Sequence, residues 1–342
     1  MLPRYPGDQP RDLSRPLEQV KVLVDARHEG QRLDVVLASV LSWRSRASIH
    51  RLIEAGRVHL EGRAASPSRR VKEGETIVVD VPQQADPSPD LSAAPELSVI
   101  HEDRWLLGID KPAGMAVHPS GRRLGGTLID LLHRRYRRHD DPSRDIVPRL
   151  LHRLDVETSG VVAVGLDEQF HQLVGRQFEE REVDKTYLAV VHGAPPERTG
   201  TIDHAIGPDS SSTVRLKQAL RDDGHGLRAV TEYTVRESRR GYTLVELRPQ
   251  TGRTHQLRVH MAAIGCPMVG DKLYGRDENA FLAHLEGRLT DEMKEWLVLD
   301  RHALHAHTLR FHHPMRGEDV VLVAPRVEIG RASCRERVSR CV

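Results

Sequence analysis

The first eighty residues carry strand-like and helix-like hydrophobic patterns in turn. Residues 20–26 (VKVLVDA) predict a strand. Residues 31–41 predict a helix, because their apolar side chains recur at helical spacing: Leu33, Val36, Leu37, Val40 and Leu41. This change from strand to helix within twenty residues indicates a small mixed domain.

A second helix is predicted over residues 45–56, with Ser45 as its N-cap and Gly56 as its C-terminal stop. Its apolar face consists of Ile49, Leu52 and Ile53. Residues 57–63 and 71–82 then predict short strands with turns between them. We expect a flexible tail at 1–19, a compact domain at 20–82 and, from its prolines, a partly stiff linker at 83–98.

From residue 99 the pattern changes to many strands and few long helices. Residues 127–136 predict a helix capped by Thr127, and residues 252–265 predict another. Strand-like segments lie at 97–110, 160–165, 185–193, 241–249 and, as a hairpin, 304–325. We therefore expect an α+β domain at 99–327, built on a mixed, mostly antiparallel sheet. Residues 277–296 look like a helical insert.

Composition adds few constraints. The chain is 38% hydrophobic and 29% charged, with a formal net charge of +2. The end, 328–342, resembles a translated sequencing adapter, and we expect it to be non-native; an authentic basic tail is the alternative. Residues 329–342 contain four arginines and one glutamate and carry +3, so the remainder is close to neutral and global charge does not argue for nucleic acid.

The remaining global features point to a protein of the cytoplasm. We find no run of eighteen apolar residues, which predicts no membrane span, and no secretory leader at the start. Without the end segment, Cys266 is the one cysteine, which fits a reducing compartment. We expect no membrane partner and a monomer.

A local basic cluster lies in the first domain. Between Arg44 and Lys72 there are eight Lys or Arg and two Glu. This composition favours nucleic-acid binding, although a solvated charged face would show the same pattern. The order of elements in 20–82 resembles the S4-like RNA-binding domain, a small α/β module. The resemblance implies that Arg44, Arg46, Arg51 and Arg57 face RNA phosphates, a role in affinity and positioning.

The loop before the predicted strand 160–165 concentrates polar chemistry in the sequence LLHRLDVETSG, residues 150–160. Thr158 and Ser159 can fix its shape by bonding backbone groups. Asp155 could be a nucleophile, a general base, a metal ligand or simply a turn-forming residue. We find none of the common zinc, calcium, ATP or dinucleotide motifs, so the sequence predicts no metal and no cofactor.

Four segments in order resemble the RluA-type pseudouridine synthases. They are KPAGMAVHP, RLLHRLDVETSG, DKTYLAVVHG and GRTHQLRVHMAAIGCPMVGDKLYG. The resemblance covers about 99–325, and an N-terminal S4-like domain is a usual companion. It implies a pseudouridine synthase fold with a long, bent, mixed sheet. It also implies isomerisation of a chosen uridine in structured RNA without a metal or cofactor.

The resemblance implies a role for five residues. Asp155 would be the catalytic aspartate, Tyr187 the ring on which the target base stacks, and Arg258 the partner of the aspartate. Arg153 would fill the gap left by the extruded nucleotide, and Lys185 would be a supporting basic position. Because Asp155 must be ionised, we expect a bidentate pair with Arg258 to oppose the effect of burial.

The sequence also gives expectations for two residues near Asp155 and leaves the RNA substrate and two other functions open. We expect His152 to contact RNA or the loop backbone and Glu157 to be solvated. The RNA is expected to be large-subunit ribosomal RNA, with transfer RNA second. A non-catalytic RNA-binding or ribosome-assembly factor is one rival function. A glycosidase-like hydrolase is the other, although that chemistry usually needs two opposed carboxylates.

Overall fold

The computed structural model of the chain describes residues 19–40, 46–80, 96–119, 126–138, 141 and 143–325. The chain divides into two compact units. One comprises residues 1–95 with 118–147, and the other residues 96–117 with 148–342. Each unit is described by itself, and the expected boundaries at 20–82, 83–98 and 99–327 stay predictions.

The first unit contains a four-stranded sheet with helices. Its elements are β1 (Gln19–Leu23), η1 (Ala26–His28), α1 (Leu33–Val40), α2 (Arg46–Glu54), β2 (Val58–Leu60), β3 (Arg63–Ala64), β4 (Thr76–Asp80) and α3 (Leu128–Tyr136). The sheet order is β1-β4-β2-β3. On the apolar faces predicted for the two helices, Val40 is half-buried and Leu41 lies outside the described residues. The other members are buried: Leu33, Val36, Leu37, Ile49, Leu52 and Ile53. Gly56 follows α2 with φ +67°, as expected of a helix stop; the proposed cap Ser45 lies outside the described residues.

The second unit is built on one long sheet. Its strands are β5 (Ser98–Glu102), β6 (Leu106–Lys111), β7 (Arg149–Leu150), β8 (Ser159–Gly165), β9 (Asp184–His192), β10 (Thr199–Asp203), β13 (Val230–Arg239), β14 (Tyr242–Pro249), β15 (Leu304–His313) and β16 (Glu318–Val323). A two-stranded sheet pairs β11 (Ile206–Pro208) with β12 (Gln218–Leu220). The helices are α4 (Glu168–Glu180), α5 (Gln256–Ala263), α6 (Asn279–Leu285) and α7 (Asp291–Leu297).

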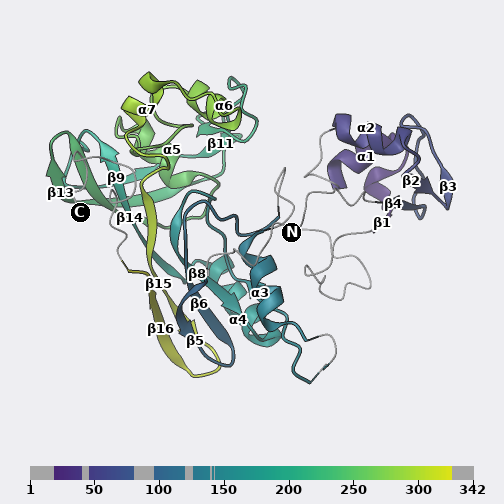
Figure 1. Ribbon diagram of the computed structural model, residues 1–342, viewed down its shortest axis with the longest axis horizontal. Helices are drawn as coiled ribbons and strands as arrows, with labels where there is room; N and C mark the ends of the chain where they lie inside the picture. Colours follow the sequence, from purple (N-terminus) through teal and green to yellow (C-terminus); the bar gives the residue numbers. More distant parts are fainter. Residues whose placement is uncertain are drawn as a thin grey trace. The chain divides into compact units, whose positions relative to one another are not determined.

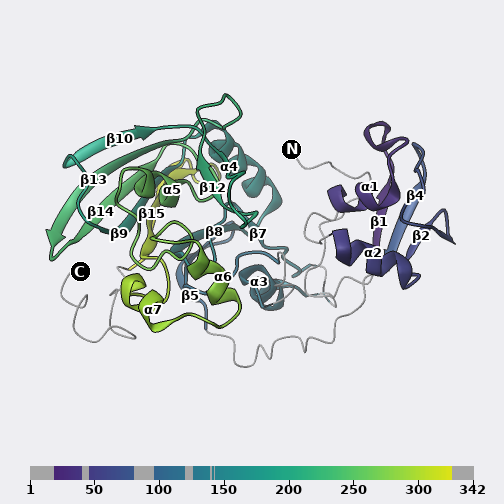
Figure 2. The same ribbon diagram turned by 90° about the horizontal axis from the view of Figure 1, so that it is seen from above.

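The strand order of the long sheet is β10-β13-β14-β9-β15-β8-β6-β5, with β16 added beside β15 and β7 beside β8. Every described pair is antiparallel except β8 with β15, which is parallel. The expected α+β class with a mixed, mostly antiparallel sheet is therefore confirmed. The sheet curves around α5 (Figure 2), and β15 carries a register shift between Ala306 and Thr308.

Helices cover the long sheet at different places. Phe170 and Val174 of α4 pack into a core with residues of β6, β8 and β15. Leu257 and Met261 of α5 pack on β9 and β14. Figure 1 shows α5, α6 and α7 gathered at one end of the sheet, and α6 with α7 forms the segment expected as a helical insert. In the described part of the chain, no helix is long and apolar enough to cross a membrane.

The contact between β8 and β15 fixes the start of β8. Gly160 pairs with Ala306 and has φ +112°, a conformation that side chains rarely adopt. A Cβ atom built there would lie 2.1 Å from the carbonyl oxygen of Ala306. The glycine therefore lets the two strands approach, and this fixes where the loop before β8 ends.

Candidate active site

The loop between β7 and β8 holds Asp155 and is fixed from both sides. The Thr158 N–H donates to the carbonyl oxygen of Asp155 at 3.1 Å, closing a turn. The Thr158 and Ser159 hydroxyls bond His302 at 2.8 Å and His305 at 3.0 Å. The expectation that these hydroxyls bond backbone groups is therefore wrong: their partners are buried histidines at the start of β15.

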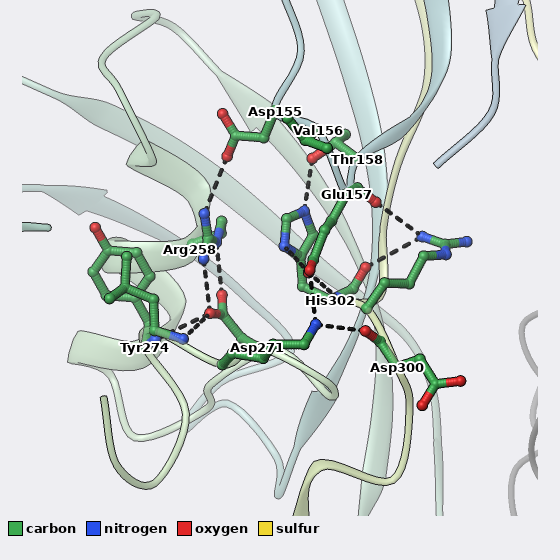
Figure 3. A network of polar contacts seen from close by, with 12 residues as sticks. Asp155, Val156, Glu157, Thr158, Arg258, Asp271, Tyr274, Asp300 and His302 are labelled. Atoms are coloured by element: carbon green, nitrogen blue, oxygen red, sulfur yellow. Dashed lines mark hydrogen bonds and ion pairs between the residues drawn. The ribbon is translucent and has the colours of Figure 1, made fainter. Parts of the chain in front are cut away.

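Arg258 lies on α5 and contacts two carboxylates (Figure 3). Its Nη1 donates to Oδ2 of Asp155 at 3.2 Å. Its Nε and Nη2 donate to Oδ2 and Oδ1 of Asp271 at 2.7 and 2.8 Å. The predicted pairing of Arg258 with Asp155 is present, but the bidentate geometry expected for it is wrong. Arg258 is already held by Asp271 and reaches Asp155 with one nitrogen.

Asp271 anchors this arrangement and was not identified from the sequence. Its side chain is fully buried and also accepts the backbone N–H groups of Leu273 and Tyr274 at 2.9 and 3.0 Å. Burial raises the pKa of Asp271, but the charge and hydrogen bonds of Arg258 outweigh it and hold the carboxyl ionised. The sequence offered one indication of its role: Asp271 lies in GDKLYG, at the end of the fourth segment that resembles the pseudouridine synthases.

The electrostatics favour a charged Asp155. Burial by itself raises the pKa of its carboxyl, but positive charge from His255, when protonated, and from Arg258 outweighs burial and lowers the pKa. Burial and Arg258 lower the pKa of His255 to about 4, so this imidazole is neutral near pH 7. Arg258 is therefore the charge that keeps Asp155 ionised at neutral pH.

A cavity of about 150 Å³ opens beside this pair. All five residues assigned from the sequence line it: Arg153, Asp155, Lys185, Tyr187 and Arg258. They come from the Asp155 loop, from β9 and from α5, so the fold brings together residues separated by more than a hundred positions. The loop 249–256, which connects β14 to α5, forms much of the remaining wall.

The side chains around the cavity differ in exposure and charge. Arg153 is exposed, and Lys185 and Tyr187 are half-buried. Burial, aided by the negative charge of Asp155, raises the pKa of Tyr187 far above neutrality, so its phenol stays protonated. Burial and the nearby Arg181 lower the pKa of Lys185. The cavity thus combines a neutral ring with one carboxylate and several cations.

The loop 249–256 is held by Gln256. Its Oε1 accepts from the Thr251 hydroxyl at 2.7 Å and from the Arg253 N–H at 3.0 Å. Its Nε2 donates to the Val230 carbonyl and to the Thr231 hydroxyl, both at 2.9 Å. All hydrogen-bonding capacity of the amide plane is used, so the wall of the cavity is rigid at this point.

Lys111 holds the Asp155 loop through hydrogen bonds to backbone carbonyls. Its side chain is fully buried, and Nζ donates to the carbonyls of Pro112, Met115 and Val156 at 2.9, 2.9 and 3.2 Å. Burial lowers the pKa of Lys111 to about 7, although the negative charge of Asp155 opposes this. The lysine therefore ties the KPAGM segment to the residue after Asp155.

Glu157 is not the solvated side chain expected from the sequence. Its Oε1 accepts from Nζ of Lys272 at 2.7 Å, and its Oε2 accepts from the backbone N–H of His302 at 3.2 Å. Burial raises its pKa, but the contacts with His302 and the charge of Lys272 outweigh it and lower the pKa to about 2. Figure 3 shows this second group beside Thr158 and Asp300. It fastens the loop to the start of β15.

His152 contacts the backbone, which is one of the two expected outcomes. Its Nε2 accepts the N–H of Ala163 in β8 at 3.0 Å, and its ring stacks on Phe178 at 5.3 Å. Burial lowers the pKa of His152 to about 4, so the ring is neutral and free to accept. The Ala163 N–H belongs to the strand β8, and a backbone hydrogen bond with Arg153 also connects the ring to the loop.

The arginines expected to face RNA phosphates are only partly visible. Arg57 is exposed between α2 and β2. Arg46 and Arg51 lie on α2, but their side chains are outside the described part, and Arg44 lies outside the described residues altogether. Their contacts with RNA stay a prediction.

The chain matches the family model described as RNA pseudouridylate synthase over residues 106–263, and the S4 domain model over residues 31–77. It is 41% identical over 301 residues to the ribosomal large subunit pseudouridine synthase D of Xanthomonas campestris, covering 86% of both chains. The chain belongs to the RNA pseudouridine synthase family.

Other pseudouridine synthases agree with this result. An uncharacterized RNA pseudouridine synthase of Bacillus subtilis, YlyB, is 32% identical and covers 91% of this chain and 96% of its own length. The structure of human RNA pseudouridylate synthase domain containing 1 superposes with a TM-score of 0.53 at 30% identity, covering 68% of this chain and 85% of its own. The resemblance, the S4 domain and the isomerase class expected from the sequence are confirmed.

Proposed function

We propose that this pseudouridine synthase isomerises chosen uridines in large-subunit ribosomal RNA, with Asp155 as its catalytic residue. The observation that carries the proposal is the position of Asp155. Its carboxylate lines the cavity, is kept ionised by Arg258, and shares the cavity with Tyr187, Arg153 and Lys185.

Access to the uridine requires base flipping. A stacked uridine does not expose C1′ or C6, so it must leave the stack at a cost of roughly a few kcal/mol. Arg153 is exposed at the cavity and can occupy the space that the nucleotide leaves. The neutral ring of Tyr187 offers a stacking surface for the uracil, worth about 1–3 kcal/mol.

The chemistry then breaks N1–C1′ and forms C5–C1′ in the same nucleotide. Asp155 can attack C1′, add to C6 or assist a glycal route, and each of these needs an ionised carboxylate. One carboxylate is enough because the detached uracil is retained and rejoined. Glu157 is engaged with Lys272, so it does not supply the second opposed carboxylate of a glycosidase.

The choice of ribosomal RNA rests on the relatives and on the first domain. Two relatives at 41% and 36% identity, from Xanthomonas campestris and Pseudomonas aeruginosa, are named ribosomal large subunit pseudouridine synthase D. The S4 domain match covers α2, the helix that carries Arg46 and Arg51. We place the enzyme in the cytoplasm, where it acts as a monomer. Transfer RNA is the second candidate substrate.

The test is to incubate the purified chain with ribosomal RNA and transfer RNA transcribed without modifications, and to map pseudouridine at single-nucleotide resolution. Pseudouridine at few positions of large-subunit RNA supports the proposal. Modification of transfer RNA alone would show that transfer RNA is the substrate in place of ribosomal RNA, and would leave the proposed chemistry unchanged. Absence of pseudouridine in both RNAs, with folded protein bound to them, would contradict the proposed catalytic role.

A further inference from the structure

His255 lies at the N-terminus of α5 in a left-handed backbone conformation, with φ 57° and ψ 13°. Residues other than glycine adopt this backbone conformation at an energetic cost, and residues strained in this way are concentrated at functional sites. The side chain is only 11% exposed and lines the cavity beside Asp155. The roles assigned above to Asp155, Tyr187, Arg153, Lys185 and Arg258 do not use this residue.

The contacts of Tyr274 select one tautomer of His255. The Tyr274 hydroxyl oxygen accepts the backbone N–H of Gln218 at 2.8 Å and lies 2.8 Å from Nδ1 of His255. With its oxygen accepting from the backbone, the phenol can direct its own hydrogen to Nδ1. The proton of the neutral ring then resides on Nε2, the nitrogen on the far side from Tyr274.

Nε2 of His255 faces the catalytic carboxylate. It lies 3.9 Å from Oδ2 of Asp155, and Nη1 of Arg258 lies 3.2 Å from the same oxygen. The opposite tautomer would direct a lone pair at this carboxylate. At 3.9 Å the contact is longer than a hydrogen bond, and catalytic contacts of this kind often tighten when the substrate is bound.

The two oxygens of Asp155 therefore have different surroundings. Oδ2 is approached by both Arg258 and His255. No side chain or backbone donor within the described ranges forms a hydrogen bond with Oδ1. A carboxylate held on one oxygen presents the other, in a fixed orientation, to the cavity.

We infer that His255, in the Nε2–H tautomer selected by Tyr274, is a positioning residue that directs a neutral donor at Oδ2 of Asp155 and leaves Oδ1 as the reacting oxygen. The inference rests on the proposed catalytic role of Asp155. A neutral donor orients the carboxylate without adding a second full charge beside Arg258, which would make Asp155 a poorer nucleophile. Burial holds the ring neutral, because it lowers the pKa of His255 to about 4.

The kinetic test compares two substitutions of His255 in single-turnover pseudouridine formation. In His255→Asn the left-handed backbone is retained, because asparagine tolerates it, but the side chain is too short to reach Asp155. In His255→Gln the longer amide carries an N–H group near the position of Nε2. We expect the asparagine variant to react about 10- to 100-fold more slowly with RNA affinity unchanged, and the glutamine variant to recover most of the rate. His225→Asn, at an exposed histidine, is the matched control.

The tautomer test does not depend on activity. Long-range ¹⁵N–¹H spectra of the histidine-labelled full chain, with His255→Asn used to assign the resonance, report which nitrogen is protonated. We expect Nε2–H at pH 7, and a shift toward Nδ1–H in Tyr274→Phe, which also slows the reaction. An Nδ1–H tautomer in the wild-type protein, or a wild-type rate for His255→Asn, would overturn the inference. A wild-type enzyme that forms no pseudouridine would instead overturn the proposed function and leave the tautomer measurement valid.

Discussion

Asp271 holds Arg258 by two hydrogen bonds, from Nε to Oδ2 at 2.7 Å and from Nη2 to Oδ1 at 2.8 Å. Arg258 therefore approaches the carboxylate of Asp155, the proposed catalytic residue, from a fixed position. A guanidinium held in this way supplies positive charge to Asp155 without having to be ordered during the reaction. The arginine thus links the buried carboxylate of Asp271 to the carboxylate of Asp155.

Replacing Asp271 with asparagine should impair both stability and activity. The variant removes one of the two charged partners of the buried Arg258 and leaves only Asp155. Breaking a buried ion pair costs about 3–5 kcal/mol. We expect a matching fall in the free energy of unfolding in urea and a marked fall in the single-turnover rate. Asp300→Asn, at an exposed aspartate nearby, is the control. Wild-type stability and rate in D271N would show that Arg258 does not need this anchor.

Gly160→Ala should destabilise the protein by about 3 kcal/mol or more, because it combines an unfavourable backbone conformation with overpacking. The added Cβ would lie 2.1 Å from the Ala306 carbonyl, where β8 meets β15. Gly175→Ala in α4 is the matched control, since no atom lies within 4 Å of its Cβ position. That change should be neutral or should stabilise by up to about 1 kcal/mol. Equal melting temperatures for the two variants would argue against the close strand contact.

The pairing of Glu157 predicts a specific pH dependence of stability. Its pKa is about 2 in the folded protein and near 4.5 in the unfolded chain. A lowered folded pKa stabilises the protein above pH 4.5, and this contribution is lost as the pH falls toward 2. The shift corresponds to about 3 kcal/mol. Urea unfolding between pH 7 and 3 should show a steeper acid loss in wild type than in Glu157→Gln; parallel curves would exclude the pairing.

The basic side chains of the first domain should contribute affinity rather than chemistry. Replacing Arg44, Arg46, Arg51 and Arg57 by alanine should weaken RNA binding and reduce the slope of log affinity against log salt by up to about 3. The single-turnover rate at saturating RNA should stay unchanged, which serves as the internal control. Binding with an unaltered salt slope would mean that these arginines do not face phosphates.

The sequence predicted which residues line the cavity better than it predicted the contacts that hold them in place. Asp155, Tyr187 and Arg258 each lie in a short sequence motif, and such a motif can be identified without knowledge of the fold. Asp271 and Lys272 also lie in a motif, but the residues with which they pair are set by the fold. Asp271 acts on a residue 13 positions away, and Lys272 reaches Glu157 across 115 positions. Hydrophobic patterns carry no information about such partners.

The fold shows the same division. Strand and helix positions follow from spacing, as for the apolar face of α1 and the fully buried β8. Which strands pair with each other in the sheet does not follow from this spacing. The parallel pairing of β8 with β15 joins residues 159–160 to 305–306, and only the glycine at position 160 makes the approach possible. A pattern of alternating residues shows that a segment is a strand, but not which strand lies beside it.

The most direct test of the account is pseudouridine formation by Asp155→Asn under single-turnover conditions on unmodified large-subunit ribosomal RNA. The variant keeps the size of the side chain but cannot supply an ionised carboxylate. We expect no detectable pseudouridine, with RNA affinity within a few-fold of wild type. Asp291→Asn, at a fully exposed aspartate, should react like wild type. Pseudouridine formed by D155N at a rate near that of wild type would contradict the central claim.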